Sequence, residues 1–255
     1  MQTFFNTQIA SKYKSNAQKI RVLSEDWATK EIFCPNCGNS IVDYENNRPV
    51  ADFYCPNCNE DYELKSKKDN IGKKIVDGAY STMIERLQSQ NNPNFFFLNY
   101  DLQTYEVINF LVIPKHFFVP EIIEKRKPLS QNARRAGWIG CNILLEDIPK
   151  SGKIFYIKNK QVRAKKNILD DWQKTFFLRE AKKTELKGWI LDIMKCIDNL
   201  GKREFTLDEI YSFENILAQK YVNNKHIKDK IRQQLQFLRD KGYLEFVNRG
   251  IYRLK

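Results

Sequence analysis

Residues 50–66, VADFYCPNCNEDYELKS, contain the pattern that decides the fold of this chain. Apolar and polar side chains alternate with period two over 50–54 and again over 61–66, and such alternation is typical of strands. A Cys-x-x-Cys pair separates the two segments. The pattern therefore predicts a strand hairpin whose turn is a cysteine knuckle.

Alternation also predicts which side chains of this hairpin meet. Asp52 lies on one face of the first strand, and Glu63 and Lys65 share a face of the second strand. Tyr62 and Leu64 take the opposite face, away from the charged side chains. If the strands pair in this register, two carboxylates and one ammonium group converge on one side of the hairpin.

A second cysteine pair lies upstream, and the two pairs match each other. Cys34-Pro-Asn-Cys37 and Cys55-Pro-Asn-Cys58 are separated by 17 residues, a spacing typical of two knuckles that face one zinc ion. Unrelated thiols are the alternative, but the repeated Pro-Asn interior favours a shared site. Because four thiolates fill the tetrahedral positions of zinc, we expect a structural and not a catalytic metal.

The charged face of the hairpin suits the hydrolysis of a phosphodiester. We predict that Asp52 and Glu63 bind Mg²⁺, which polarises a phosphoryl oxygen and lowers the pKa of a bound water. Lys65 is predicted to orient or deprotonate the attacking water and to stabilise the charge of the transition state. An ordinary solvated face is the alternative. Glu25 and Asp26, late in the preceding helix, either support the metal site or are ordinary exposed carboxylates.

The composition of the whole chain points to a polyanionic partner. The 255 residues carry a formal charge of +12 with a pI near 9.3. Nucleic acid is favoured over an anionic membrane, because no apolar run approaches the ~20 residues of a membrane span. The N-terminal residues lack the basic and then apolar order of a signal peptide, so we expect a cytoplasmic protein. In that reducing compartment Cys141 and Cys196 are expected to be ordinary buried thiols.

The sequence around the hairpin predicts an α/β domain, with a mixed sheet, helices on both sides and the zinc knuckles inserted into it. A long basic segment at 125–140 has no clear period and is predicted to be a loop. The other expected elements are a helix after a capping box at Ser15, a helix through Ile75, Ala79, Met83 and Leu87, strands at 95–100, 105–113 and 154–157, and a helix at 170–180.

A smaller domain is expected to follow. We predict a first domain over residues 1–181 and a second over 182–255, with a linker at 181–184. Three helices and a small hairpin in about 70 residues are the layout of a winged helix, a small α+β fold related to helix-turn-helix domains. The expected elements are helices at 185–199, 207–219 and 225–241, and strands at 204–206, 244–246 and 251–253.

The basic residues of the second domain concentrate near its C-terminal end. Over 225–255, lysine and arginine outnumber aspartate and glutamate by nine to three, which favours DNA binding by the last helix and the hairpin. A solvated basic face is the alternative, as is a buried capping role for His226. The helix is expected to bury a stripe of Ile227, Ile231, Leu235 and Leu238. The predicted DNA contacts are Lys225, His226, Lys228, Arg232 and Gln233 on the helix, and Arg249 and Arg253 on the wing.

The hairpin and its surroundings resemble a known nuclease family. Asp52 with Glu63-Leu-Lys65 resembles the PD-(D/E)xK signature, with Pro49 displaced by two residues from the literal Pro-Asp pair, a departure that many members show. Longer segments resemble the DpnI-like methyl-directed restriction endonucleases over essentially the whole chain. These segments are 34–38, 45–55, 63–68, 133–142, 224–228 and 230–236.

This resemblance implies a restriction-endonuclease-like core followed by a C-terminal winged helix. It also implies cleavage of double-stranded DNA at GATC sites whose adenines carry an N6-methyl group, with Mg²⁺ as the catalytic metal and both domains reading the methylated sequence. We expect a monomer in solution. Two rivals stand beside this reading. One is a zinc and winged-helix protein that binds DNA without cleaving it, as a regulator or methylation sensor, and the other is a nuclease with a different substrate.

The basic loop offers a way to read such a methyl group. N6-methylation of adenine removes one donor proton and adds an apolar group in the major groove. We predict that Trp138 forms an aromatic wall around this methyl group, while Arg134 and Arg135 read guanine. The alternative for Trp138 is that its ring anchors the loop to the core.

Overall fold

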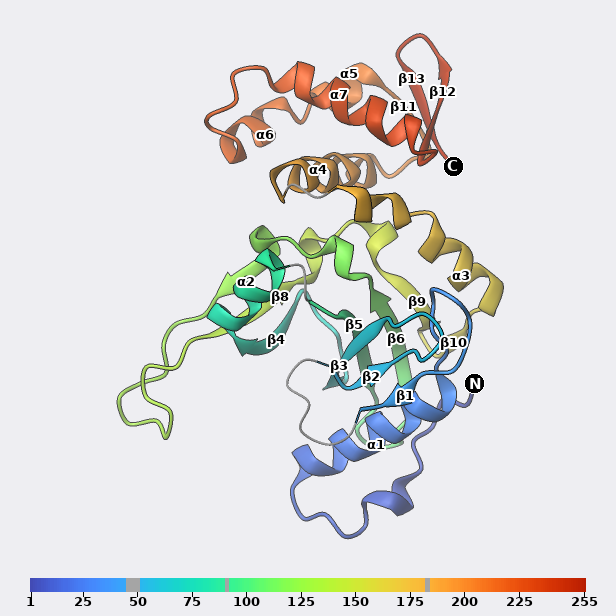
Figure 1. The fold of residues 1–255 in the computed structure, drawn as a ribbon, viewed down its shortest axis with the longest axis vertical. Coiled ribbons are helices and arrows are strands. Elements are labelled where there is room, and N and C mark those ends of the chain that lie inside the picture. The colour runs from blue at the N-terminus through green and yellow to red at the C-terminus, as the bar shows by residue number, and fades with distance from the viewer. Residues whose placement is uncertain (45–50, 90–91, 182–183) are drawn as a thin grey trace. The chain divides into compact units, whose positions relative to one another are not determined.

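The computed structural model describes residues 1–44, 51–89, 92–181 and 184–255 (Figure 1). Pro49 and Val50, which belong to the predicted signature and first strand, lie outside the described residues. Every helix among the described residues is too short or too polar to cross a lipid bilayer. The chain divides into two compact units: a first unit, Met1–Glu146 with Gly152–Gln173, and a second unit, Asp147–Ser151 with Lys174–Lys255.

A mixed sheet forms the centre of the first unit. Within the described residues it has seven strands in the order β1-β2-β3-β5-β6-β9-β10. β3 runs parallel to β5, and the other neighbouring pairs are antiparallel. The strands are β1 (Val42–Asp43), β2 (Phe53–Tyr54), β3 (Asp61–Lys68), β5 (Asn94–Tyr100), β6 (Val107–Ile113), β9 (Ile154–Lys158) and β10 (Gln161–Val162). The predicted mixed-sheet α/β core is therefore confirmed.

The central strand β5 shows why the sheet is covered on both faces. All of its residues are buried, which is what a strand packed on two sides requires. Phe96 and Leu98 point to one face and join a core cluster with Trp27 of α1 (Asn16–Glu31) and Trp172 of α3 (Lys165–Gln173). Because successive side chains alternate, Phe95 and Phe97 lie on the other face, the same face as Glu63 and Lys65 of the neighbouring β3.

A smaller sheet belongs to the same unit. Within the described residues it has three antiparallel strands in the order β4-β8-β7, and α2 packs against it. Their bounds are β4 (Lys74–Ala79), β7 (Ile123–Lys125), β8 (Gly140–Leu144) and α2 (Tyr80–Gln88). This sheet was not expected from the sequence, because β4 lies in a predicted helix and β7 borders the predicted loop.

The helix predicted through Ile75 and Ala79 is wrong over its first half, since α2 begins only at Tyr80. A spacing of four residues is an even number, so it returns to the same face of a strand as well as of a helix. Ile75 is buried while the exposed fraction of the next side chain, Val76, is 61%. This alternation, together with two β-branched residues in succession, favours a strand.

Other predicted elements differ in their limits. Ser15 occupies the N-cap of α1, but its side chain makes no capping hydrogen bond, so the predicted capping box is wrong. The helix expected at 170–180 ends at Gln173, and a 3₁₀ helix follows. The helix expected at 207–219 is interrupted at Ser212 and Phe213. The strand expected over 50–54 is short, with β2 only at its end.

The second unit contains the predicted winged-helix elements. The described residues give helices followed by an antiparallel hairpin, with a sheet in the order β11-β13-β12. Ile231, Leu235 and Leu238 are fully buried and Ile227 is nearly so, which confirms the predicted core stripe. The elements are α4 (Thr184–Leu200), β11 (Glu204–Thr206), α5 (Leu207–Tyr211), α6 (Glu214–Lys220), α7 (Ile227–Asp240), β12 (Leu244–Asn248) and β13 (Ile251–Leu254). The predicted helix-turn-helix-related domain is therefore confirmed.

Candidate active site and DNA-binding surfaces

The two cysteine knuckles have the same local backbone structure. The amide of Gly38 donates to the carbonyl of Cys34, and the amide of Asn59 donates to the carbonyl of Cys55, each at 2.8 Å. Gly38 and Asn59 both have positive φ angles, +78° and +57°. Glycine and asparagine tolerate this left-handed conformation better than other residues. The residue after each Cys-Pro-Asn-Cys therefore allows the turn to close.

The four knuckle cysteines form one cluster of sulfur atoms. Their Sγ atoms all lie within 4.8 Å of one another, with Cys34 to Cys58 at 3.5 Å and Cys37 to Cys55 at 3.4 Å. A tetrahedral zinc ion with Zn–S bonds of about 2.3 Å separates its sulfur ligands by about 3.8 Å. The cluster therefore has the donor set and the spacing that a zinc ion requires.

The second knuckle is the turn of the predicted hairpin, and that prediction is confirmed. β2 pairs antiparallel with β3, with Phe53 opposite Tyr62. The Tyr62 ring stacks on Phe96 at a centroid distance of 4.5 Å, and its hydroxyl lies 3.0 Å from the Sγ of Cys34. The Tyr62 side chain thus joins Cys34 of the first knuckle to the core of the sheet, at the position where β2 and β3 pair.

The charged side chains lie on the predicted face of this hairpin. The carboxylate of Asp52 accepts a hydrogen bond from the amide of Leu64 at 2.7 Å, which fixes it across the two strands. The ammonium group of Lys65 lies 2.5 Å from Oε1 of Glu63. Burial raises the pKa of Glu63, Lys65 lowers it, and the charges of Asp77 and Asp52 raise it further. The three predicted catalytic residues therefore lie close enough to interact.

Two residues that the sequence did not single out complete this charged cluster. Asp77 of β4 lies 2.5 Å from the ammonium group of Lys65, and its side chain is only 6% exposed. Arg86 of α2 lies 3.5 Å from Oε2 of Glu63. Burial alone lowers the pKa of Lys65, but the charges of Glu63 and Asp77 outweigh it and hold that pKa above the ordinary lysine value.

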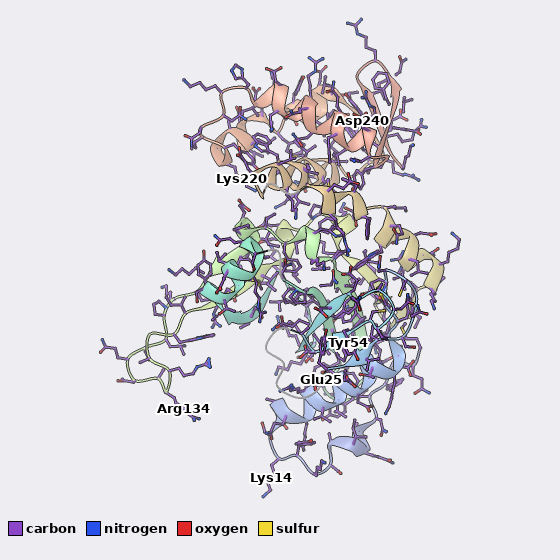
Figure 2. All side chains as sticks on the ribbon, in the orientation of Figure 1. Lys14, Glu25, Tyr54, Arg134, Lys220 and Asp240 are labelled. Carbon is purple, nitrogen blue, oxygen red and sulfur yellow. The ribbon has the colours of Figure 1, made fainter. Side chains whose placement is uncertain are left out.

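The two acidic residues of α1 that the sequence singles out, Glu25 and Asp26, have different partners. Glu25, labelled in Figure 2, pairs with Arg21 at 2.7 Å. Burial raises the pKa of Glu25, Arg21 lowers it, and the charge of Asp52 raises it, so Glu25 lies within electrostatic reach of the candidate site. Asp26 instead pairs with Lys30, one turn further along the helix, at 2.6 Å.

The carboxylate of Glu63 has an oxygen atom that is suited to bind a hard cation. Oε2 of Glu63 is buried and accepts no hydrogen bond within the described residues, although the guanidinium of Arg86 lies 3.5 Å away. A buried carboxylate oxygen without a hydrogen bond is costly, and an oxygen-binding cation would satisfy it. Asp52 and Glu63 therefore offer ligands that suit Mg²⁺.

The predicted basic loop is partly ordered as an arm that continues β7 and β8. The amide of Arg126 donates to the carbonyl of Gly140 at 3.0 Å, and the amide of Leu129 donates to the carbonyl of Trp138 at 2.9 Å. Figure 1 shows this arm extending well beyond its sheet, and Figure 2 places Arg134 near the tip. We call residues 126–139 the basic arm.

The ring of Trp138 is held in a defined position on the basic arm. The guanidinium of Arg135 lies over it, 4.7 Å from the ring centroid. A Cβ at Gly140 would approach the ring to 2.8 Å, so any larger residue there would require the ring to shift. The ring is half-buried, whereas Arg134 and Arg135 are exposed. The Trp138 ring therefore packs at the base of the basic arm and stays partly exposed, and its part in reading a methyl group stays a prediction.

The predicted contacts of the second unit are exposed on α7 and the wing. His226 precedes α7 with a side chain that is 82% exposed, so the alternative of a buried capping role is wrong. Lys228 pairs with Glu214 at 3.3 Å. Arg253 pairs with Glu204 and Glu245 at 2.8 and 2.7 Å, whereas Arg232 has no ion pair with another described residue. Lys225, Gln233 and Arg249 are also exposed.

Comparison with protein families covers nearly the whole chain. Residues 1–181 match the model described as DpnI, Dam-replacing family, and residues 185–254 match DpnI_C, the Dam-replacing HTH domain. The chain belongs to the Dam-replacing family. The resemblance noted in the sequence is thereby confirmed. Membership in the Dam-replacing family indicates a nuclease of the restriction type that binds DNA, with a helix-turn-helix domain at residues 185–254.

Sequence reasoning missed Asp77 in this Dam-replacing chain for a definite reason. The residue was placed in a helix, where its side chain would have had no fixed relation to the hairpin. The signal in the sequence is the β-branched pair Ile75-Val76, which favours a strand. In the structure Ile75 is buried, Val76 is exposed and the Asp77 side chain is 6% exposed, so the carboxylate lies on the inner face. Cys141 lies opposite Asp77 on β8 and is a buried thiol, as predicted. Burial, then the charge of Asp77, raises the pKa of Cys141 to about 12.

Proposed function

We propose that this chain is a methyl-directed restriction endonuclease that hydrolyses phosphodiester bonds of double-stranded DNA at GATC sites carrying N6-methyladenine. The observation that carries the proposal is the partly buried cluster of carboxylates and a lysine on the zinc-knuckle hairpin, in a chain of the Dam-replacing family. The finer claims, GATC, the methyl group and the metal, draw on the sequence motifs that resemble the DpnI-like enzymes.

In this proposal Asp52 and Glu63 hold a magnesium ion. Bound Mg²⁺ supplies Lewis-acid chemistry, since it polarises a phosphoryl oxygen and lowers the pKa of a bound water. The hydrogen bond from Leu64 keeps the Asp52 carboxylate oriented, and the buried Oε2 of Glu63, which accepts no hydrogen bond within the described residues, provides a second ligand. The four cysteines hold zinc in a purely structural role, because no tetrahedral position is left for substrate.

Lys65 acts as a donor in this proposal. Its ammonium group lies between two carboxylates at 2.5 Å from each, an arrangement that a charged donor satisfies and a neutral amine does not. The sequence left open whether Lys65 orients or deprotonates the attacking water. The contacts support orientation of the water, together with stabilisation of the developing phosphoryl charge. They do not favour removal of a proton from water by Lys65.

Two separate surfaces are proposed to read the DNA. The basic arm places Arg134, Arg135 and Trp138 where arginines read guanine and the indole contacts the methyl group. The second unit offers the polar side of α7 and its wing for the major groove and the phosphates. The proposed contacts of that unit are Lys225, His226, Lys228, Arg232, Gln233, Arg249 and Arg253.

The deciding experiment uses two preparations of one plasmid that differ only in adenine methylation at GATC. Each is incubated with the purified chain and Mg²⁺, and a third plasmid without GATC sites is the control. We expect fragments at the GATC positions of the methylated plasmid alone. Binding assays with Ca²⁺ in place of Mg²⁺ measure affinity for each DNA without cleavage.

Each other outcome of this experiment rejects part of the proposal. Methylated plasmid that is bound but intact would leave a non-catalytic DNA-binding protein. Equal cutting of both plasmids would keep the nuclease and remove the methyl specificity. Cutting of the plasmid without GATC sites would remove the sequence specificity.

A further inference from the structure

Asp77 is a buried carboxylate that comes from a different sheet than the proposed catalytic residues. It lies on β4 of the smaller sheet, whereas Glu63 and Lys65 lie on β3 of the main sheet. Its Oδ1 atom is 2.5 Å from the ammonium group of Lys65. The contact therefore links the two sheets of the first unit at the candidate site.

The backbone of β4 changes where it presents this carboxylate. The pairing of β4 with β8 shifts register between Asp77, opposite Cys141, and Ala79, opposite Gly140, with Gly78 as the extra residue. A bulge of this kind bends a strand and redirects a side chain, and bulges occur often beside active sites. The bulge lies open, because a Cβ built at Gly78 would meet no atom within 4 Å.

The burial of Asp77 is expensive without a partner. An isolated buried carboxylate loses its hydration, and a buried ion pair recovers only part of that loss. Apolar residues of similar volume often stabilise a fold at least as well as such a pair. Stability alone therefore does not explain a carboxylate at this position. Its partner is Lys65, a proposed catalytic residue, which points to a role in the reaction.

Lys65 shares one of its two carboxylate partners with the proposed metal. Glu63 contacts the ammonium group through Oε1 and is also a proposed magnesium ligand. When the Glu63 carboxylate binds a cation, its electrostatic attraction for Lys65 falls. Asp77 lies on another sheet and is not a proposed metal ligand, so its attraction for Lys65 does not fall in this way. Asp77 is thus the partner that can hold Lys65 while the metal is bound.

We propose that Asp77 is a positioning residue, which fixes the ammonium group of Lys65 for the reaction. This inference rests on the proposed function, because it assigns Asp77 a part in the same nuclease site. It predicts that loss of the Asp77 charge releases Lys65 without removing a ligand from the metal. A metal ligand would behave differently, because its loss would raise the magnesium concentration that the enzyme needs.

The test variant is Asp77→Asn, which keeps the size of the side chain and removes its charge. Single-turnover cleavage of methylated DNA should slow by roughly 10- to 100-fold, the usual range for a residue that orients an active-site group. The half-saturating Mg²⁺ concentration and the affinity for DNA in Ca²⁺ should change by less than about twofold. The melting temperature of each variant is measured alongside.

A second readout does not depend on cleavage. Low-extent acetylation followed by mass spectrometry reports how accessible and how firmly held each lysine is. Acetylation of Lys65 should rise severalfold in Asp77→Asn. Glu124→Gln is the matched control, because it breaks the Lys74–Glu124 pair, also 2.5 Å long, within the same small sheet. In that variant acetylation should rise at Lys74 and stay unchanged at Lys65, with cleavage intact.

Several outcomes would overturn the inference. Unchanged acetylation of Lys65 in Asp77→Asn would show that Asp77 does not hold it. A tenfold rise in the required Mg²⁺ would make Asp77 a ligand, and cleavage lost only in step with a lower melting temperature would make its role structural. If the unsubstituted chain leaves methylated DNA intact, the proposed function fails and the catalytic role of Asp77 with it, while acetylation still decides whether Asp77 holds Lys65.

Discussion

The hairpin of the first unit and α7 of the second unit both gather charged side chains, but in opposite surroundings. On the hairpin, Glu63 and Lys65 are 18% and 23% exposed, and each contacts a charged partner from the fold. On α7, the polar side faces solvent, and Arg232 has no ion pair with another described residue. The buried side of the same helix carries no charge: Ile231 and Leu235 are fully buried there, beside the uncharged Gln234.

This contrast shows which charged side chains have their position and direction determined by the fold. A buried charge must have its partners nearby, so the fold fixes both the residue and the direction of its side chain. An exposed charge on a helix is fixed only by its face, and its final position depends on the DNA that it meets. We therefore expect substitutions on the hairpin to act sharply on one chemical step, and substitutions on α7 to act gradually on affinity.

The largest expected effect is that of Asp52→Asn. Loss of this carboxylate removes a proposed magnesium ligand, so single-turnover cleavage of methylated DNA should fall by roughly 10³-fold or more. Affinity for the same DNA in Ca²⁺ should stay within about twofold, because the DNA-binding surfaces are untouched. Asp170→Asn on α3, an exposed carboxylate paired with Lys166, is the control and should cleave normally. A parallel loss of affinity and cleavage would contradict the separation of site and surface.

The second largest expected effect is that of zinc removal, which should destabilise the hairpin and leave α7 unchanged. Structural zinc contributes folding free energy to the segments that bind it, about 10–16 kcal/mol in zinc-finger peptides. After chelation, with metal loss verified by elemental analysis, amide hydrogen exchange over 53–66 should rise by about 100-fold or more. Exchange over 227–240, which contains α7, should not change, and added Zn²⁺ should restore protection.

A pair of cysteine variants sharpens this second prediction. Cys37→Ser should reproduce the effect of chelation on 53–66, because it removes one of the four clustered sulfurs. Cys196→Ser, in the second unit, changes a buried thiol outside the cluster and should leave exchange over 53–66 as it was. If both variants loosen the hairpin equally, or neither does, the stabilising role of the zinc knuckle is wrong.

The same contrast explains what the sequence could predict. The hairpin was predictable because period-two alternation and paired Cys-x-x-Cys motifs constrain the same few residues. The strand that carries Asp77 had a local signal, but the contact of Asp77 with Lys65 had none, because that contact joins two sheets. The basic arm lacks a period because none of its residues is buried, so no buried face imposes alternation on its sequence. On α7 the core stripe was predictable, while the contacts with DNA depend on a partner that sequence periodicity does not describe.

The smallest expected effect compares two arginines of the second unit. Arg253 is already paired with Glu204 and Glu245, so little of its charge is left for a phosphate. Arg232 has no such ion pair among the described residues, and its full charge faces solvent. In Ca²⁺, Arg232→Ala should weaken DNA binding by about tenfold and lower the slope of log affinity against log salt by about 1, as for one lost phosphate contact. Arg253→Ala should change affinity by less than about threefold. Equal losses of affinity for the two variants would contradict this prediction. They would mean that an ion pair within the fold does not reduce the contribution of an exposed arginine to DNA binding.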